Sequence, residues 1–259
     1  MSEPSTAAPA TRSAISLGAV SLVAGVVVAA ALIVGAIAGH HVTAYVFAVA
    51  GLGLSWGWPV LIDAPRPAGS SIVLAIGTVG MTGVLLLSGH HDGMRALSAV
   101  LAVALVLAFL HELVRTDGRA SLVLSIAGTC LGLAFLASGA TYAAAAFHHH
   151  GSEAVAVTAG AACLGLLVHG TLGRTHAAEW SVPVSLALGA VLGLVVGLSS
   201  GTRWNILLLA GLIAAAVAAA VRRVVDADGT TTAATVAYGA AAILAPGICA
   251  YAAVWILAH

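Results

Sequence analysis

The fold of this chain is decided by residues 182–199, which read VPVSLALGAVLGLVVGLS and contain no ionisable side chain. A helix needs about 20 apolar residues to cross a hydrocarbon core about 30 Å thick, and this stretch is close to that length. Its continuous apolarity favours a helix, because a β-barrel strand would alternate apolar and polar residues. In lipid, a helix also satisfies its own backbone hydrogen bonds. We therefore predict a transmembrane helix here.

Comparable apolar runs occur along the whole chain, at residues 15–38, 42–62, 70–88, 94–114, 121–147, 153–170, 204–221 and 233–257. Together they predict an all-α, polytopic transmembrane bundle of about nine spans. Residues 1–13 are polar and are predicted to form a disordered cytoplasmic tail, so that residues 14–259 make a single transmembrane domain. Pro246 is expected to bend the last span, because proline lacks the N–H for one helical hydrogen bond.

Composition excludes several classes of protein. Of the 259 residues, 61% are hydrophobic and only 7% are charged, and the mean hydropathy is +1.11. A soluble domain carries about 25% charged residues, so this chain cannot cover a water-facing surface, and a soluble globular enzyme is excluded. The formal net charge is +0 and no basic run is present, which excludes nucleic acid as a partner. The lipid bilayer is the expected partner.

The arginines predict the orientation of the bundle. Loops with few arginines alternate along the chain with loops that carry most of them. The arginine-rich set starts with the N-terminal tail and contains Arg12, Arg66, Arg115, Arg119, Arg174, Arg222 and Arg223. The opposite set holds only Arg95 and Arg203. Because positive charge collects on the cytoplasmic side, the N-terminus is predicted to be cytoplasmic, in a bacterial plasma membrane.

Glycines recur at helical spacing in residues 182–199 and just beyond, at Gly189, Gly193, Gly197 and Gly201. Small residues four positions apart form a flat stripe on which a second helix backbone can lie closely. We predict that this stripe packs against another helix of the same chain. A homo-oligomer formed through the same face is the alternative.

Most of the 11 histidines fall in loops predicted to be external. The candidate metal ligands among these loops are His40, His41, His90, His91, Asp92, His148, His149 and His150. Imidazole binds Zn²⁺ and Cu²⁺ and changes its charge near neutral pH, so these loops predict either a metal site or a pH sensor. The third interpretation is that histidine is simply the polar residue used in these short loops.

Arginines and acids meet in two loops predicted to be cytoplasmic. His111-Glu112-Leu113-Val114-Arg115 begins like a zinc metalloprotease motif, but Arg115 replaces the second histidine, so that motif is rejected. The candidate contacts for a lipid headgroup or phosphate are Glu112, Arg115, Arg119, Arg222 and Arg223. Ion pairing at helix ends, with arginines anchoring the cytoplasmic side, is the simpler interpretation.

The composition of the whole chain, rich in Ala, Val and Gly and free of lysine, resembles the integral membrane proteins that actinobacterial genomes encode in large numbers. The turn Phe109 to Arg119, F-x-x-E-x-x-R-x-D-G-R, is similar to turns in such proteins. The resemblance implies an integral membrane protein and assigns no activity or functional residue.

The function expected from these features is that of a permease-like or accessory component for an apolar or lipid-like molecule, acting alone or in a larger membrane complex. No Asp, Glu, Arg or Lys lies near the middle of a span, which argues against proton-coupled transport through a central carboxylate. One alternative is a metal-binding or pH-responsive protein that uses the external histidines. Another is a membrane-edge enzyme of lipid or envelope metabolism. No catalytic or cofactor motif is present, so an enzyme is the weaker expectation.

Overall fold

The computed structural model describes residues 10–87, 93–114, 122–173, 175, 177–224 and 231–259, except for the side chains of residues 10–17. The described elements are α1 (Ala10–Ala38), α2 (His40–Leu61), α3 (Pro67–Leu87), α4 (Gly93–Val114), α5 (Leu122–Ala145), α6 (Gly151–Leu172), η1 (Ala178–Trp180), α7 (Ser181–Ser200), α8 (Trp204–Val224), α9 (Thr232–Leu244) and α10 (Gly247–Ala258). Strands are absent from these residues. The all-α prediction is confirmed.

Nine helices within the described residues are long and apolar enough to cross a membrane, α9 and α10 together making the ninth. This confirms the predicted number of spans, and the chain is a multi-pass membrane protein by this measure. Helix α1 begins at Ala10, inside the segment predicted to be a tail, while residues 1–9 lie outside the described part. The cytoplasmic position of the N-terminus stays a prediction.

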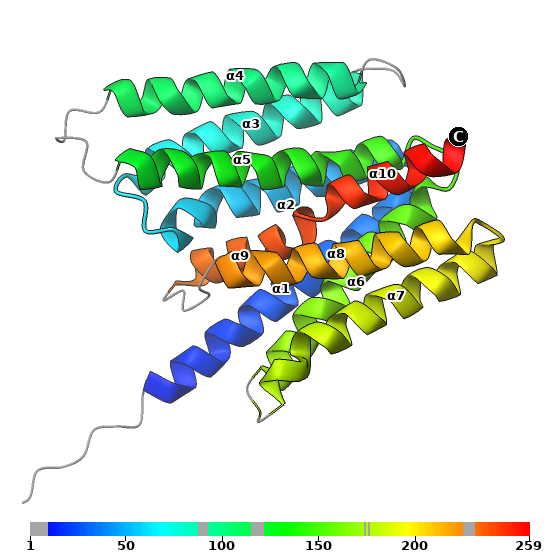
Figure 1. Ribbon diagram of the computed structural model, residues 1–259. Coiled ribbons are helices and arrows are strands. Elements are labelled where there is room, and N and C mark those ends of the chain that lie inside the picture. Colours follow the sequence, from blue (N-terminus) through cyan, green and yellow to red (C-terminus); the bar gives the residue numbers. More distant parts are fainter. Residues whose placement is uncertain (1–9, 88–92, 115–121, 174, 176, 225–230) are drawn as a thin grey trace, which may run out of the picture.

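The helices form two outer groups around a central one (Figure 1). Helices α3, α4 and α5 pack on one another at one side of the bundle, and α6, α7 and α8 pack on one another at the other side. Between them, α1 and α2 both contact α9, which together with α10 completes the centre. The core lies where this central group meets α5 and α6.

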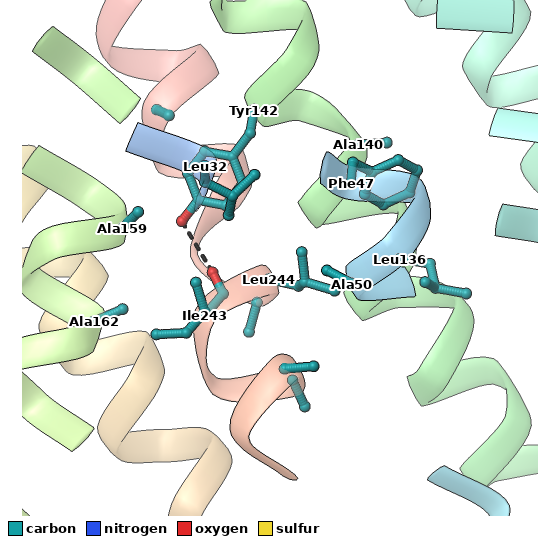
Figure 2. Packing of buried hydrophobic residues seen from close by; sticks show 14 of the residues in the cluster. Leu32, Phe47, Ala50, Leu136, Ala140, Tyr142, Ala159, Ala162, Ile243 and Leu244 are labelled. Carbon is teal, nitrogen blue, oxygen red and sulfur yellow. Dashed lines mark hydrogen bonds between the residues drawn. The ribbon is translucent and has the colours of Figure 1, made fainter. Parts of the chain in front are cut away.

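The centre of the core combines a few large side chains with many alanines (Figure 2). Leu32 of α1, Phe47 of α2 and Tyr142 of α5 are fully buried there, beside Ile243 and Leu244 of α9. Alanine dominates the facing surface of α6, for example at positions 159 and 162. Small residues let helix backbones approach closely, which is how helices gain packing contacts in lipid.

The last span is broken, as the sequence predicts. Helix α9 ends at Leu244 and α10 begins at Gly247, with Ala245 and Pro246 between them. The hydroxyl of Ser138 on α5 donates to the Ala245 carbonyl at 2.6 Å and accepts from the Ile248 N–H at 3.0 Å. Tyr142 donates to the Ile243 carbonyl at 3.0 Å (Figure 2). Side chains of α5 therefore satisfy backbone groups that the break would otherwise leave unpaired.

Most of the described hydroxyls at depth bond to their own helix, as Ser and Thr side chains in helices commonly do. Thr78, Thr82 and Thr158 each donate to the carbonyl four residues earlier. Ser138 is one exception, since its partners lie on the last span; Ser125 and Thr129 of α5 also reach other helices. A hydroxyl that bonds to its own helix does not need a transported molecule as a hydrogen-bond partner. These hydroxyls therefore do not mark a polar path through the bundle.

The glycine stripe of α7 lies against α8. A Cβ placed on Gly189 would lie 2.5 Å from the Gly211 carbonyl oxygen, and one on Gly193 would lie 2.1 Å from the Leu207 carbonyl oxygen. At Gly197 the nearest atom would be Cα of Trp204, at 2.6 Å. Gly201 is outside this contact: it ends α7 with a φ of 68°, and no atom lies within 4 Å of its Cβ position.

Candidate functional site

An apolar groove runs between α1, α2 and α9 on the outside of the bundle. Its volume is about 500 Å³, which is within the range of about 300–1,000 Å³ for small-molecule sites. The lining residues are Ala24, Val27, Val28, Ala31, Val42, Tyr45, Val46, Val49, Ala50, Gly53, Val236 and Ala240. The lining residues all belong to helices that are long and apolar enough to span a membrane.

The shape of the groove follows from the sizes of its residues. Small residues, among them Ala50 and Gly53, leave the space, while larger ones stand at its edge. Val49 is 74% exposed and Tyr45 is 59% exposed, which places the edge in contact with lipid. A Cβ on Gly53 would meet only Val236, at 3.8 Å, so this position opens onto free space.

The groove extends from the start of α2 to the middle of the membrane. Val42 lies in the first turn of α2, whereas Gly53 lies near the middle of that helix. At 1.5 Å per residue, the two positions are about 16 Å apart along the axis. Tyr45, near the membrane edge, has a phenol that is suited to the boundary between headgroups and hydrocarbon. The groove can therefore hold an extended chain with its polar end near Tyr45.

Sequence reasoning missed this groove. Its residues are alanine, valine and glycine in three separate spans, and each of them is typical of a lipid-facing helix. The only local signal is the small pair Ala50 and Gly53 on α2, next to the larger Val49. Nothing in the sequence places α1 and α9 on the two sides of that pair.

The histidine loops α1–α2 and α5–α6 lie next to each other. The ring of His40 stacks on Phe147 with a centroid distance of 3.7 Å, and His41 lies 3.8 Å from His40. In the second loop, the rings of His149 and His150 are 4.4 Å apart. The remaining candidates of this group, His90, His91 and Asp92, lie outside the described residues.

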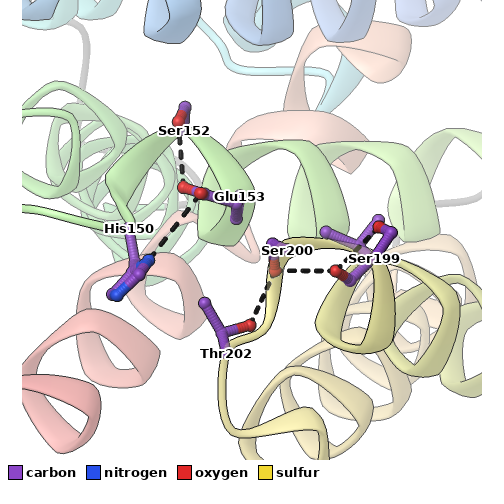
Figure 3. Close-up of polar contacts among 7 residues, drawn as sticks. His150, Ser152, Glu153, Ser199, Ser200 and Thr202 are labelled. Atoms are coloured by element: carbon purple, nitrogen blue, oxygen red, sulfur yellow. Dashed lines mark hydrogen bonds and ion pairs between the residues drawn. The ribbon is translucent and has the colours of Figure 1, made fainter.

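Aromatic and hydrogen-bonding contacts dominate around these histidines. His148 packs edge-on against Tyr251 of α10 at 5.9 Å. Nδ1 of His150 lies 3.7 Å from Glu153, which also accepts a hydrogen bond from Ser152 at 2.9 Å (Figure 3). At the α7–α8 turn, Ser199 and Ser200 each donate to the Val196 carbonyl, and the Ser200 hydroxyl also bonds to that of Thr202 (Figure 3). Among the described residues no three His, Cys, Asp or Glu side chains are arranged to hold a metal ion.

Glu112 is buried near the end of α4, at 3% exposure. Ser125 of α5 donates a hydrogen bond to its carboxylate at 2.5 Å, and Thr129 continues the polar chain to Ser70 of α3 at 3.2 Å. The preceding His111 packs over Gly69, where a Cβ would lie 2.0 Å from the imidazole ring. Arg115 and Arg119, predicted to act with Glu112, lie outside the described residues.

Arg222 and Arg223 are neighbours in sequence but lie in different surroundings. Arg222 turns toward α6, where its Nη1 donates to the Gly165 carbonyl at 2.6 Å. Its Nε and Nη2 are buried and have no hydrogen-bond partner. Arg223 is exposed. The two arginines therefore differ in burial and in hydrogen bonding, although both are predicted to contact the same headgroup or phosphate.

No protein family, curated protein or solved structure matches this chain.

Proposed function

We propose that this chain is a permease-like or accessory membrane protein that holds a lipid-like molecule in the groove between α1, α2 and α9. The observation that supports this function is the groove itself, which has about 500 Å³ and a lining that is almost wholly hydrocarbon. Its occupant is a molecule with a long apolar chain and a small polar end at Tyr45. The bacterial plasma membrane is the proposed location.

Filling the groove should prevent binding. In Gly53→Leu the new side chain enters open space, since only Val236 lies near the Cβ position. We expect the labelling of the groove by a photoactivatable diazirine phospholipid to fall about tenfold. This corresponds to a loss of about 1.4 kcal/mol of binding free energy when the apolar contact with the lipid chain is removed. The label is located by mass spectrometry of peptides from α1, α2 and α9 after irradiation in nanodiscs.

The matched control is Gly83→Leu on α3. Gly83 has nothing within 4 Å of its Cβ position and so has room for a larger side chain, but it does not line the groove. This variant should label like the wild type. Equal labelling of Gly53→Leu and Gly83→Leu, or wild-type labelling spread evenly over all lipid-facing helices, would contradict the proposed function.

A second candidate function is metal or proton binding at the external histidines, and one observation favours it. The stacking of His40 on Phe147 brings the α1–α2 and α5–α6 loops together. We propose that imidazoles from the start of α2 and from the α5–α6 loop bind a common ion, with Zn²⁺ or Cu²⁺ as the expected metal.

Calorimetric titration of the purified protein with Zn²⁺ tests this candidate. We expect binding tighter than millimolar that disappears when His40, His41 and His148 are changed to alanine. His259, which hydrogen-bonds to the Trp255 carbonyl, provides the control, and His259→Ala should bind like the wild type. Binding no tighter than millimolar in the wild type would remove this candidate.

A further inference from the structure

Arg222 is a half-buried cation at the meeting point of three helices. It lies on the last turn of α8, and its guanidinium donates to the Gly165 carbonyl of α6. A Cβ on Gly165 would lie 3.7 Å from Nη2 of Arg222 and 3.8 Å from the hydroxyl of Ser185 on α7. The guanidinium therefore lies among α6, α7 and α8.

The hydrogen-bonding capacity of this guanidinium is only partly used. Among the described residues its one hydrogen bond goes to Gly165, while Nε and Nη2 are buried without a partner. A buried charge is costly unless it is paired and hydrogen-bonded. Within the described part of the chain no carboxylate pairs with Arg222. Nε and Nη2 therefore lack an acceptor in the described structure, and a ligand that reached them would satisfy both.

The neighbouring side chains are also suited to an anion. His169 of α6 and Tyr238 of α9 are the titratable groups within electrostatic reach of the guanidinium. Imidazole and phenol each donate a hydrogen bond, and neither brings a negative charge at neutral pH. Ser185 adds a hydroxyl, which now donates to the Ser181 carbonyl at 2.6 Å.

Phosphate is the anion that these donors fit best. A guanidinium offers parallel N–H groups that bind two oxygens of one phosphate, which ammonium groups cannot do. We propose that Arg222 binds a phosphate group, of an anionic lipid headgroup or of free phosphate, among α6, α7 and α8.

The position in the bundle matches the level of lipid phosphates. Helix α6 ends at Leu172, α8 ends at Val224 and α9 begins at Thr232, so Arg222 lies close to the surface where these three ends meet. Arginines at a membrane surface attract anionic headgroups. This site is separate from the groove, which opens between α1, α2 and α9, so the proposal does not depend on the proposed function.

Native mass spectrometry of the detergent-purified full chain tests the proposal, with phosphatidylglycerol and phosphatidylcholine as the two probes. The wild type should retain phosphatidylglycerol in preference to phosphatidylcholine. Arg222→Gln should weaken that retention about tenfold or more, since hydrogen bonds between charged groups are lost. The matched control is Arg223→Gln, which removes the same charge from an exposed neighbour and should change retention less than about threefold.

Inorganic phosphate distinguishes the two sources. If millimolar phosphate displaces phosphatidylglycerol and raises the melting temperature of the wild type but not of Arg222→Gln, the ligand is free phosphate. If only the lipid has this effect, the ligand is a headgroup, and either result supports the site.

Equal retention of phosphatidylglycerol by the wild type and Arg222→Gln would overturn the proposal. If Arg222→Gln does not fold, Arg222→Lys keeps the charge but loses the paired N–H groups, and its retention should be weakened several-fold. A wild type that shows neither a preference for phosphatidylglycerol nor stabilisation by phosphate also overturns the proposal, without any variant.

Discussion

Gly193→Ala should destabilise the protein by about 3 kcal/mol, although the substitution adds a single methyl group. The new Cβ would lie 2.1 Å from the Leu207 carbonyl oxygen and 2.6 Å from its carbon. These are backbone atoms of α8, so no side-chain rotation relieves the overlap, and α7 must move away from α8. Reversible unfolding in mixed micelles, followed by circular dichroism, measures the change.

Gly83→Ala is the control and should change stability in the opposite direction. Nothing lies within 4 Å of its Cβ position, so the substitution adds no overlap. Alanine is favoured over glycine inside a helix by about 1 kcal/mol, so this variant should be more stable than the wild type. If Gly193→Ala were also more stable than the wild type, helix propensity rather than the contact of α7 with α8 would control the stability.

The same contact bears on the assembly of the protein. Gly189 and Gly211 face each other so closely that a Cβ on either would lie within 2.5 Å of the other's carbonyl oxygen. The stripe is therefore already covered by α8 of the same chain. A homo-oligomer would have to form through another face, such as the exposed side of α7 that carries Val191 and Val195.

The helices could be predicted from sequence because lipid leaves the backbone few choices. A long apolar run must satisfy its own N–H and C=O groups, so length and apolarity alone indicate a span. The break at Pro246 was predictable for the same reason, since proline removes one of those groups. The hydrogen bonds from Ser138 and Tyr142 to the broken span were not predictable, because these two residues lie on a different span, more than 100 residues away.

The candidate sites depend on directions in space that the sequence does not give. Arg222 and Arg223 look equivalent in sequence, yet one residue turns a helix by about 100°. That turn directs Arg222 to Gly165 and leaves Arg223 exposed. The groove depends in the same way on how α1, α2 and α9 cross. His40 contacts Phe147 of the α5–α6 loop, but no group of three metal ligands is found among the described residues, so the predicted metal site stays a prediction.

Ser138→Ala should cost about 2 kcal/mol, because it removes two of the three hydrogen bonds described between α5 and the broken span. The Ala245 carbonyl and the Ile248 N–H would lose their partner at once, at a depth where water is scarce. Ser98→Ala is the matched control: Ser98 is exposed and donates only to the Met94 carbonyl of its own helix, so its loss should cost less than about 0.5 kcal/mol.

Combining Ser138→Ala with Pro246→Ala then tests the mechanism. Alanine at position 246 lets the helix continue and satisfy its own backbone, so the cost of removing the Ser138 hydroxyl should fall markedly in that background. Additive costs would mean that Ser138 stabilises the bundle for some reason other than the repair of the break.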